Sequence, residues 1–230
     1  MRVAALYDVH GNLPALDAVL TEVDADIILV GGDVAAGPWP AETLARLRGL
    51  DGDVRFIRGN ADRELVQRKQ GLAPPHLMEF VRERLSPDDL SFLGSLPLTE
   101  TIDVNGVGSV LFCHATPRND EEILTRISPD ENWGAALESV DADVVVCGHT
   151  HMQFERTIDG VHLVNAGSIG MPYEREPGAY WALFGPEVEL RRTPYEPGDI
   201  GSSGWPDEWP QATPEEATEL FERMSREQRS

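Results

Sequence analysis

The stretch Val3-Ala4-Ala5-Leu6-Tyr7-Asp8-Val9-His10-Gly11-Asn12 places an apolar run directly before a cluster of polar residues. Short apolar runs of this kind indicate buried strands. In open α/β sheets, ligand-binding residues gather outside the carboxyl ends of the strands. Later apolar runs end in the same way, and the polar patches that follow them are Gly32-Asp33, Gly59-Asn60, His114 and Gly148-His149-Thr150-His151. The sequence therefore predicts a polar site at one edge of a sheet.

Apolar runs and helical periodicities alternate along the chain, as is typical of α/β proteins. The expected strands are Val3–Tyr7, Ile27–Val30, Val54–Ile57, Thr99–Val104, Ser109–Cys113, Val144–Cys147, His162–Val164, Ala179–Phe184 and Val188–Arg192. Asn105-Gly106 predicts a β-hairpin among otherwise parallel units. The strands suffice for two mixed β-sheets packed on each other and flanked by helices, which is a four-layer αββα sandwich.

Capping residues mark several helix starts. Asn12 precedes the periodic segment Leu13–Val23. Ser128-Pro129-Asp130-Glu131 and Thr213-Pro214-Glu215-Glu216 match the capping box, in which the first and fourth residues cap each other. The remaining expected helices are Ala41–Leu50, a stretch from Asp62 to Leu85 broken near Pro74-Pro75, one opening at Ser86, and one from Ser128 to about Ser139.

The polar patches contain the residue types that hold divalent cations. Two cations a few ångströms apart need carboxylate, imidazole and amide ligands from several segments. His149 and His151 are two residues apart, so in extended backbone both imidazoles point the same way. Asp8, Asp33 and Asn60 would each be an ordinary turn residue if it stood alone. The set as a whole is typical of a metal site rather than of unrelated turns.

In order, these motifs resemble those of the calcineurin-like metallophosphoesterases, reading DVHGN, GGD, GN, H and GHTH. The resemblance runs from Met1 to about Pro172. The segment Asn165–Pro172 is similar to the small single-domain bacterial and archaeal phosphodiesterase branch, which lacks a large cap domain. The resemblance implies the same αββα sandwich.

The resemblance also implies a dinuclear metal centre with seven ligands. One metal would be held by Asp8, His10 and His151, a second by Asn60, His114 and His149, and Asp33 would bridge the two. Mn²⁺ is the expected cation, and Fe, Zn²⁺ or Ni²⁺ suit the same donors.

The expected reaction is in-line attack of a metal-bridging hydroxide on a phosphoester, without a covalent enzyme intermediate. Asn60 and His114 are expected to be catalytic as well as ligating. Arg118 lies four residues after His114 and could contact the phosphate or the leaving group, because guanidinium groups pair well with phosphate oxygens. A surface arginine is the alternative interpretation.

Three residues depart from the family's pattern. Ala61 stands where relatives often have a histidine that protonates the leaving oxygen, so the general acid is unassigned, with Asp62 and Arg118 as candidates by proximity. Ala166 and Tyr173 replace a proline and an arginine that are common in the small branch. These changes leave the metal ligands intact and concern the substrate pocket.

The chain is strongly acidic, with 19 basic and 40 acidic residues and a net charge of −21. Long nucleic acids usually need a basic stripe, and none is visible, so we expect a small phosphorylated substrate and no long nucleic acid. The N-terminus has no signal-like apolar region, and no apolar run approaches membrane-spanning length. Cys113 and Cys147 lie inside predicted strands, as reduced, buried thiols would. We therefore expect a cytoplasmic protein without membrane contact.

The expected organisation is a metallophosphoesterase domain over residues 1–196, a linker over 197–212 and a C-terminal helix over 213–230. The linker is rich in Gly, Ser, Pro and Trp. Leu220, Phe221 and Met224 would form an apolar stripe that packs on the domain or on a second subunit, giving a homodimer. A partly disordered acidic tail is the alternative. Because no predicted ligand lies beyond His151, the tail is expected to be dispensable for metal binding and turnover.

Three classes of function fit the sequence. The first is a dinuclear-metal-dependent phosphodiesterase or phosphatase, which includes phosphoanhydride hydrolases, acting on a small nucleotide-like substrate. The second is a non-catalytic scaffold that keeps the metallophosphoesterase fold for protein interaction; the intact ligand set argues against it. The third is a nuclease of the same superfamily, which the net charge disfavours.

Overall fold

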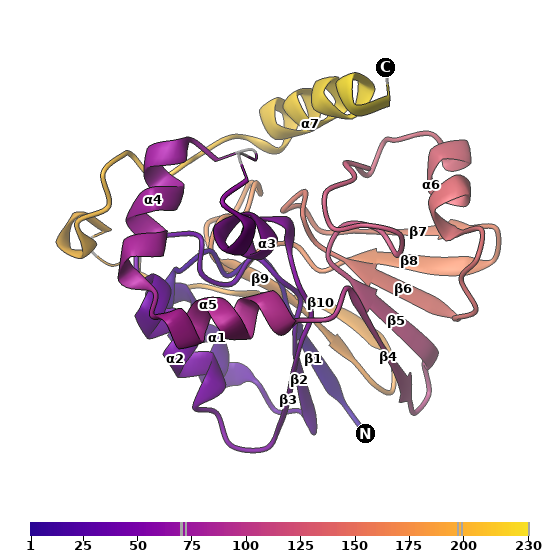
Figure 1. Cartoon of the computed structure of the whole chain (residues 1–230). Helices are drawn as coiled ribbons and strands as arrows, with labels where there is room; N and C mark the ends of the chain where they lie inside the picture. The colour runs from indigo at the N-terminus through magenta and orange to yellow at the C-terminus, as the bar shows by residue number, and fades with distance from the viewer. Residues whose placement is uncertain (70, 72, 197, 199, 230) are drawn as a thin grey trace.

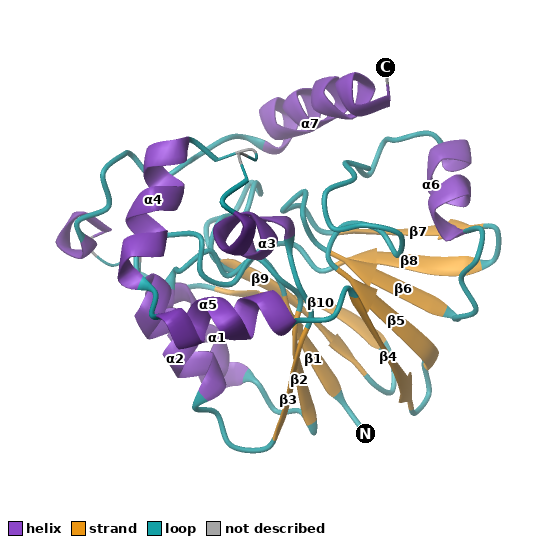
Figure 2. Cartoon of the chain, in the orientation of Figure 1, coloured by secondary structure: helices purple, strands orange, loops and turns teal. Residues whose placement is uncertain are grey.

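The computed structural model describes residues 1–69, 71, 73–196, 198 and 200–229. Two five-stranded sheets face each other, and helices lie outside them (Figures 1 and 2). The first sheet has the strand order β10-β9-β1-β2-β3 and the second β4-β5-β6-β8-β7. Both sheets contain parallel and antiparallel pairs. The predicted four-layer sandwich of two mixed sheets is confirmed.

The elements are short and alternate along the chain. The strands are β1 Val3–Leu6, β2 Ile27–Val30, β3 Asp53–Phe56, β4 Thr99–Val104, β5 Gly108–Cys113, β6 Val144–Cys147, β7 Phe154–Ile158, β8 Val161–Asn165, β9 Ala179–Phe184 and β10 Val188–Thr193. The helices are α1 Leu13–Glu22, α2 Pro40–Arg48, α3 Asn60–Gln67, α4 Pro75–Arg84, α5 Pro87–Ser95, α6 Asp130–Leu137, the 3₁₀ turn Ile200–Ser203 and α7 Pro214–Arg229.

The side chains of β1 point alternately into the two buried layers on either face of the first sheet. Val3 and Ala5 face the second sheet, whereas Ala4 and Leu6 face the helices outside the first sheet. This period of two follows from the strand's pleat. Because both faces of β1 are covered, every residue in it is fully buried, which explains its continuous apolar sequence.

Helices complete the two outer layers. In Figure 1, α1, α2, α4 and α5 lie outside the first sheet, where their apolar residues share one buried cluster with that sheet. α6 covers the second sheet through Trp133 and Leu137. Cys113 and Cys147 lie in this outer cluster as free, buried thiols.

Two local expectations were wrong. Ser128 does not cap α6, because its hydroxyl donates to Glu222 in α7 instead, and Pro129 occupies the cap position. The strand β7 was missed, although Asp159-Gly160 between β7 and β8 is a strong hairpin signal. The cap at Asn12 and the capping box at Thr213 are confirmed.

The C-terminal segment packs on the domain. Phe221 and Ala217 of α7 form a buried cluster with Ile123 and Met152. Trp205, inside the predicted linker, packs edge-on against Phe80 of α4, with ring centroids 5.3 Å apart. Residues 197 and 199 of the predicted linker and residue 230 of the predicted helix lie outside the described residues, as do residues 70 and 72 of the stretch predicted as broken helix.

None of the helices formed by the described residues is long and apolar enough to cross a membrane.

Candidate metal centre

The predicted ligands meet at the carboxyl edge of both sheets. Asp8 follows β1, Asp33 follows β2, His114 follows β5 and His149 follows β6, while Asn60 is the first residue of α3 after β3. Each of the seven side chains is buried, with the residue at most 6% exposed. The strand order therefore assembles residues that are up to 143 positions apart in the chain, from Asp8 to His151.

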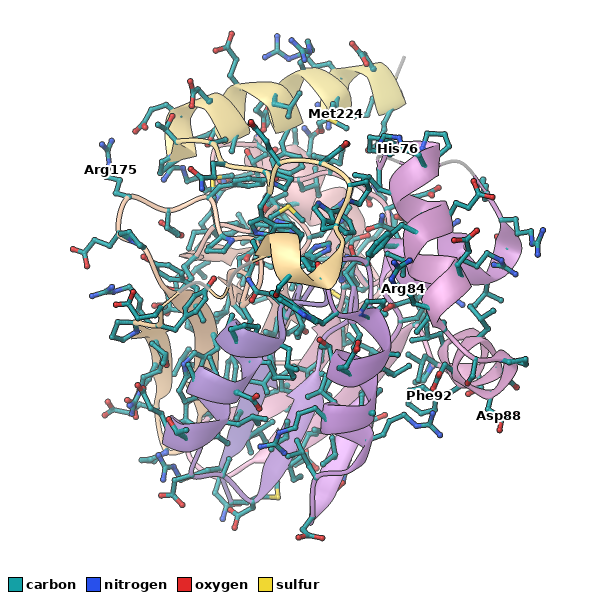
Figure 3. All side chains as sticks on the ribbon, turned by 90° about the vertical axis from the view of Figure 1, so that its left-hand side faces the viewer. His76, Arg84, Asp88, Phe92, Arg175 and Met224 are labelled. Atoms are coloured by element: carbon teal, nitrogen blue, oxygen red, sulfur yellow. The ribbon has the colours of Figure 1, made fainter. Side chains whose placement is uncertain are left out.

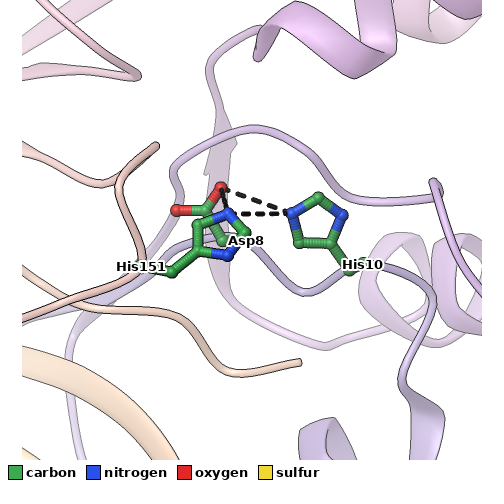
Figure 4. Close-up of side chains that lie close together, drawn as sticks. All are labelled: Asp8, His10 and His151. Carbon is green, nitrogen blue, oxygen red and sulfur yellow. Dashed lines mark hydrogen bonds and ion pairs between the residues drawn. The ribbon is translucent and has the colours of Figure 1, made fainter. Parts of the chain in front are cut away.

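Asp8, His10 and His151 form one group of converging donor atoms, shown in Figure 4. The Nε2 atoms of His10 and His151 lie 3.1 Å apart. Asp8 Oδ1 lies 3.2 Å from His151 Nε2 and 3.7 Å from His10 Nε2. This group contains the three residues expected at the first metal.

Asp33 and His114 form a second group, and Asp8 belongs to it too. His114 Nε2 lies 3.5 Å from Asp33 Oδ2, 3.8 Å from Asp8 Oδ1 and 3.2 Å from Asn60 Oδ1. Asp33 Oδ2 is also 3.8 Å from His10 Nε2 in the first group. Both carboxylates therefore lie between the two groups, whereas the family resemblance implied this position only for Asp33.

Backbone carbonyls fix three of the imidazoles. Ala36, Gly31 and Met171 accept hydrogen bonds from Nδ1 of His10, His114 and His151, at 3.2, 2.9 and 2.8 Å respectively. A carbonyl can only accept, so each Nδ1 carries a proton, and each ring turns its Nε2 toward the centre as the atom that could bind a metal. Such tethering is the usual way that proteins orient histidine ligands.

The buried polar atoms fit a cation between them. The Nε2 atoms of His10 and His151 lie 3.1 Å apart, and this close contact needs positive charge between them, either a shared proton or a bound cation. Asp8 Oδ1 and His149 Nε2 are also buried, and neither has a hydrogen-bond partner among the described residues. Leaving such atoms unsatisfied costs about 1–3 kcal/mol each, so both atoms call for a ligand. The donor set of carboxylate, imidazole and amide suits a divalent transition metal.

The backbone at the centre is strained. Asp8, His10, Asp33, His149 and His151 have φ between 47° and 64°, in the left-handed region. Only two other non-glycine residues among those described, Arg68 and Asp159, have positive φ. This conformation costs non-glycine residues about 1–3 kcal/mol each and clusters at functional sites. Five of the seven candidate ligands therefore have this left-handed backbone conformation.

Gly59 and Gly148 each lie so close to a carboxylate that there is no room for a side chain. A Cβ on Gly59 would lie 2.1 Å from Asp33 Oδ1, and a Cβ on Gly148 would lie 2.4 Å from Asp8 Oδ2. Each glycine thus admits a carboxylate that a side chain would push away. The Gly-Asn and Gly-His pairs of the sequence motifs have this steric origin.

Electrostatics at the centre are dominated by the two carboxylates. Burial would lower the pKa of His114, but Asp33 and Asp8 outweigh it and raise this pKa to about 10. Burial would raise the pKa of Asp33, but His114 and His10 lower it to about 2. Burial and the neighbouring His114 lower the pKa of His149 to about 4. The negative charge that attracts a proton to His114 would also attract a metal cation.

Arg118 and Asp62, the two candidates for the general acid, are both engaged in other contacts. The Arg118 guanidinium binds the Glu122 carboxylate and donates to the carbonyl of Ala135, and it does not line the cavity over the candidate centre. Asp62 accepts hydrogen bonds from the amides of Asp33, Val34 and Gly59. Arg118 is thus placed as a surface arginine, and Asp62 holds the ligand loops together.

A cavity of about 400 Å³ opens over the candidate centre. Its floor includes the ligands His10, Asp33, Asn60, His149 and His151. Glu64, which sequence reasoning missed, also lines it and accepts a hydrogen bond from Asn60 Nδ2 at 3.3 Å. Its spacing of four residues from Asn60 on one helix face was the available signal. Burial raises the pKa of Glu64 to about 7.

Several known proteins resemble this chain in sequence or in fold. A metallophosphoesterase from Sphaerobacter thermophilus has a similar structure, with 26% identity, a TM-score of 0.73 and coverage of 90% of this chain and 95% of that one. An uncharacterized protein of Methanocaldococcus jannaschii is 26% identical over 84% of this chain and 88% of its own length. A symmetrical bis(5'-nucleosyl)-tetraphosphatase of Janthinobacterium is 30% identical, but the match spans only 50% of this chain and 43% of that protein.

The calcineurin-like phosphoesterase superfamily domain matches residues 1–184. That range contains all seven candidate ligands and ends with β9. The chain therefore belongs to the calcineurin-like phosphoesterase superfamily.

Proposed function

We propose that this protein is a metal-dependent phosphoesterase that hydrolyses a small, nucleotide-like phosphodiester or phosphoanhydride. The observation that carries the proposal is the convergence of histidine Nε2 atoms and two carboxylates around buried atoms that have no hydrogen-bond partner among the described residues. Because the chain belongs to the phosphoesterase superfamily, we assign this donor set to phosphoester hydrolysis.

Two divalent cations, with Mn²⁺ as the first candidate, would be held by the seven ligands. Asp8, His10 and His151 would serve one cation, Asn60, His114 and His149 the other, and Asp33 would contact both. When bound, such cations neutralise phosphoryl oxygens and lower the pKa of water. Asn60 and His114 would be catalytic as well as ligating, and the amide oxygen of Asn60 lies 3.2 Å from Nε2 of His114.

Three backbone carbonyls and the Asp62 carboxylate would fix the geometry of the ligands. The backbone carbonyls of Ala36, Gly31 and Met171 hold three imidazoles in the ligating tautomer. Asp62 ties the loop that carries Asp33 to Gly59, which precedes Asn60. The buried position of every ligand lets the fixed charges act in a medium of low dielectric constant.

The test is a panel of phosphomonoesters, cyclic nucleotides, dinucleoside polyphosphates and aryl phosphodiesters, assayed with Mn²⁺ and again with a chelator. Turnover that requires the metal is the expected result, and no turnover of any class would contradict the proposal. Metal counting by mass spectrometry should show that Asp33→Asn loses more metal than His151→Ala.

Asp159→Asn is a matched control for Asp33→Asn. Asp159 also has a positive φ, but it lies in the exposed turn between β7 and β8. It should retain full metal content. Full occupancy of two metals in Asp33→Asn would reject the shared role of Asp33.

A further inference from the structure

The cavity over the candidate centre has a polar floor and an apolar roof. Leu77, Met78 and Val81 of α4 form one wall. The C-terminal segment adds six further lining residues, Trp205, Trp209, Pro210, Leu220, Phe221 and Met224. Figure 3 shows α7 as an upper layer across the molecule, with Met224 labelled on it. A segment outside the matched superfamily domain therefore builds a large part of the roof.

Several contacts hold this roof in place. Trp209 Nε1 donates to the carbonyl of Gly170 at 3.3 Å, and its ring lies 5.6 Å from that of Trp205. In α7, the buried Glu222 carboxylate accepts hydrogen bonds from the hydroxyls of Thr125 and Ser128, both at 2.6 Å. Buried polar contacts of this kind fix one docked position of the helix, because breaking them leaves a carboxylate without partners.

Tyr173 joins the roof to the floor. Its ring stacks on the imidazole of His151, with centroids 5.3 Å apart and planes inclined by 17°. The opposite contact is with Phe221 of α7, at 6.1 Å between centroids. The aromatic wall thus begins directly beside a candidate metal ligand.

The charge of the cavity lining favours a substrate with a single phosphate over a polyphosphate. The described residues that line this cavity include the acidic Asp33 and Glu64 but neither lysine nor arginine. A tetraphosphate chain bears several negative charges, and burying them beside apolar walls without cationic partners is unfavourable. A single phosphate would be neutralised at the floor, while its organic group would lie against the roof.

A smaller cavity shares the lining residues Asn60, Glu64 and His149 with the first. Its volume is about 110 Å³, and Lys69 and Gln228 are among its lining residues. This space suits a small polar ester group. It is too small for the remaining phosphates and the second nucleoside of a dinucleotide.

We propose that the C-terminal segment from Trp205 to Met224 forms the binding site for an apolar, aromatic ester group, and that the substrate is a phosphodiester with a single phosphate. The proposal rests on the proposed phosphoesterase function for its phosphate site. It deepens that function by favouring phosphodiesters over polyphosphates.

The first experiment measures binding without turnover. The metal-loaded full-length protein is titrated with 1-naphthylmethylphosphonate and with methylphosphonate, and calorimetry and tryptophan fluorescence report binding. The naphthyl compound should bind at least about tenfold more tightly, since burying its ring removes apolar surface from water. Equal affinities would overturn the proposal.

A charge in the roof should remove this preference. Leu220 is 42% exposed and lines the cavity, so Leu220→Asp places a carboxylate there without disturbing the core. Ile127→Asp is the matched control, because Ile127 is 63% exposed and does not line the cavity. Leu220→Asp should weaken naphthyl binding about tenfold more than methylphosphonate binding, whereas Ile127→Asp should change neither. Equal effects of the two variants would contradict the assigned roof.

The second experiment compares kcat/KM for naphthyl p-nitrophenyl phosphate, methyl p-nitrophenyl phosphate and a dinucleoside tetraphosphate. The expected order places the naphthyl diester first and the tetraphosphate last. Faster turnover of the tetraphosphate would overturn the proposal. Naphthyl-selective binding without hydrolysis of any substrate would refute the phosphoesterase activity and still support the apolar site, so the two failures are distinguishable.

Discussion

The Asp62 carboxylate accepts a hydrogen bond from the backbone amide of Asp33 at 2.8 Å. The same carboxylate accepts from Gly59 at 3.0 Å and from Val34 at 3.1 Å. One buried side chain therefore links the loop after β2 to the start of α3. Burial and the neighbouring Asp33 raise the pKa of Asp62 to about 6, which the amide hydrogen bonds partly offset.

Asp62→Asn should lower the free energy of unfolding by about 1–3 kcal/mol, because an amide has one acceptor oxygen where the carboxylate has two. Metal content should fall as well, since Asp33 and Gly59, which precedes Asn60, lose their common anchor. Urea unfolding and metal counting check both effects. An unchanged unfolding free energy would show that the three amides do not depend on this carboxylate.

Asp120 predicts a pH dependence of stability. Burial raises its pKa, but hydrogen bonds from Arg63 and Arg58, at 3.0 and 2.9 Å, outweigh burial and leave the pKa below 3.8. Because the folded-state pKa is depressed, the stabilisation is present above about pH 4, the unfolded-state value, and is lost as pH falls through the folded-state pKa.

Asp120→Asn should therefore cost about 1–3 kcal/mol of unfolding free energy at pH 7 and progressively less below pH 4. Urea unfolding of both proteins between pH 7 and pH 3 measures the difference. Asp88→Asn is the control, since Asp88 is an exposed acid in the first turn of α5. A difference that grew as pH fell would contradict the assigned ion pairs.

Ala61 predicts how rate depends on the leaving group. It follows Asn60 and lines the cavity floor, where an imidazole could otherwise donate a proton. General acid catalysis contributes about 10²–10⁴ in rate, so its absence should make kcat fall steeply as the leaving-group pKa rises. Aryl esters and anhydrides should react faster than alkyl esters.

Ala61→His should flatten this dependence, and Ala73→His, which adds a ring at another position in the lining of the same cavity, should not. A series of substituted phenyl esters gives the slope. A shallow slope in the natural chain would mean that another group, such as Glu64, supplies the proton.

Truncation after Glu196 tests whether the C-terminal segment is dispensable for metal binding and whether it forms the apolar roof of the cavity. The shorter chain should retain both metals, because every predicted ligand lies at or before His151. It should lose the naphthyl preference, and its thermal midpoint should fall because Ile123 and Met152 lose their cover. Trp209→Ala provides a second variant with the core intact. A truncated chain with the full naphthyl preference would be inconsistent with the apolar roof.

Local sequence signals predicted the sandwich and the grouping of the candidate ligands. Asp8, Asp33 and His114 follow apolar runs, and parallel strands bring such ends together. The roof could not be predicted in this way, because Trp205 and Trp209 lie in a segment without periodicity, and their partners are distant in sequence. Ser128 shows the same limit: its local capping signal was overridden by Glu222, 94 residues later.

The left-handed backbone of the candidate ligands also bears on engineering. A directed-evolution screen that selected only for resistance to heat in the presence of a chelator would favour glycine at these positions, since glycine relieves about 1 kcal/mol or more of strain at such a φ. Asp8, His10, Asp33, His149 and His151 would be among the first residues lost. Selection for thermostability should therefore be run with metal present, so that the bound cation stabilises the left-handed conformation that is unfavourable in the metal-free protein.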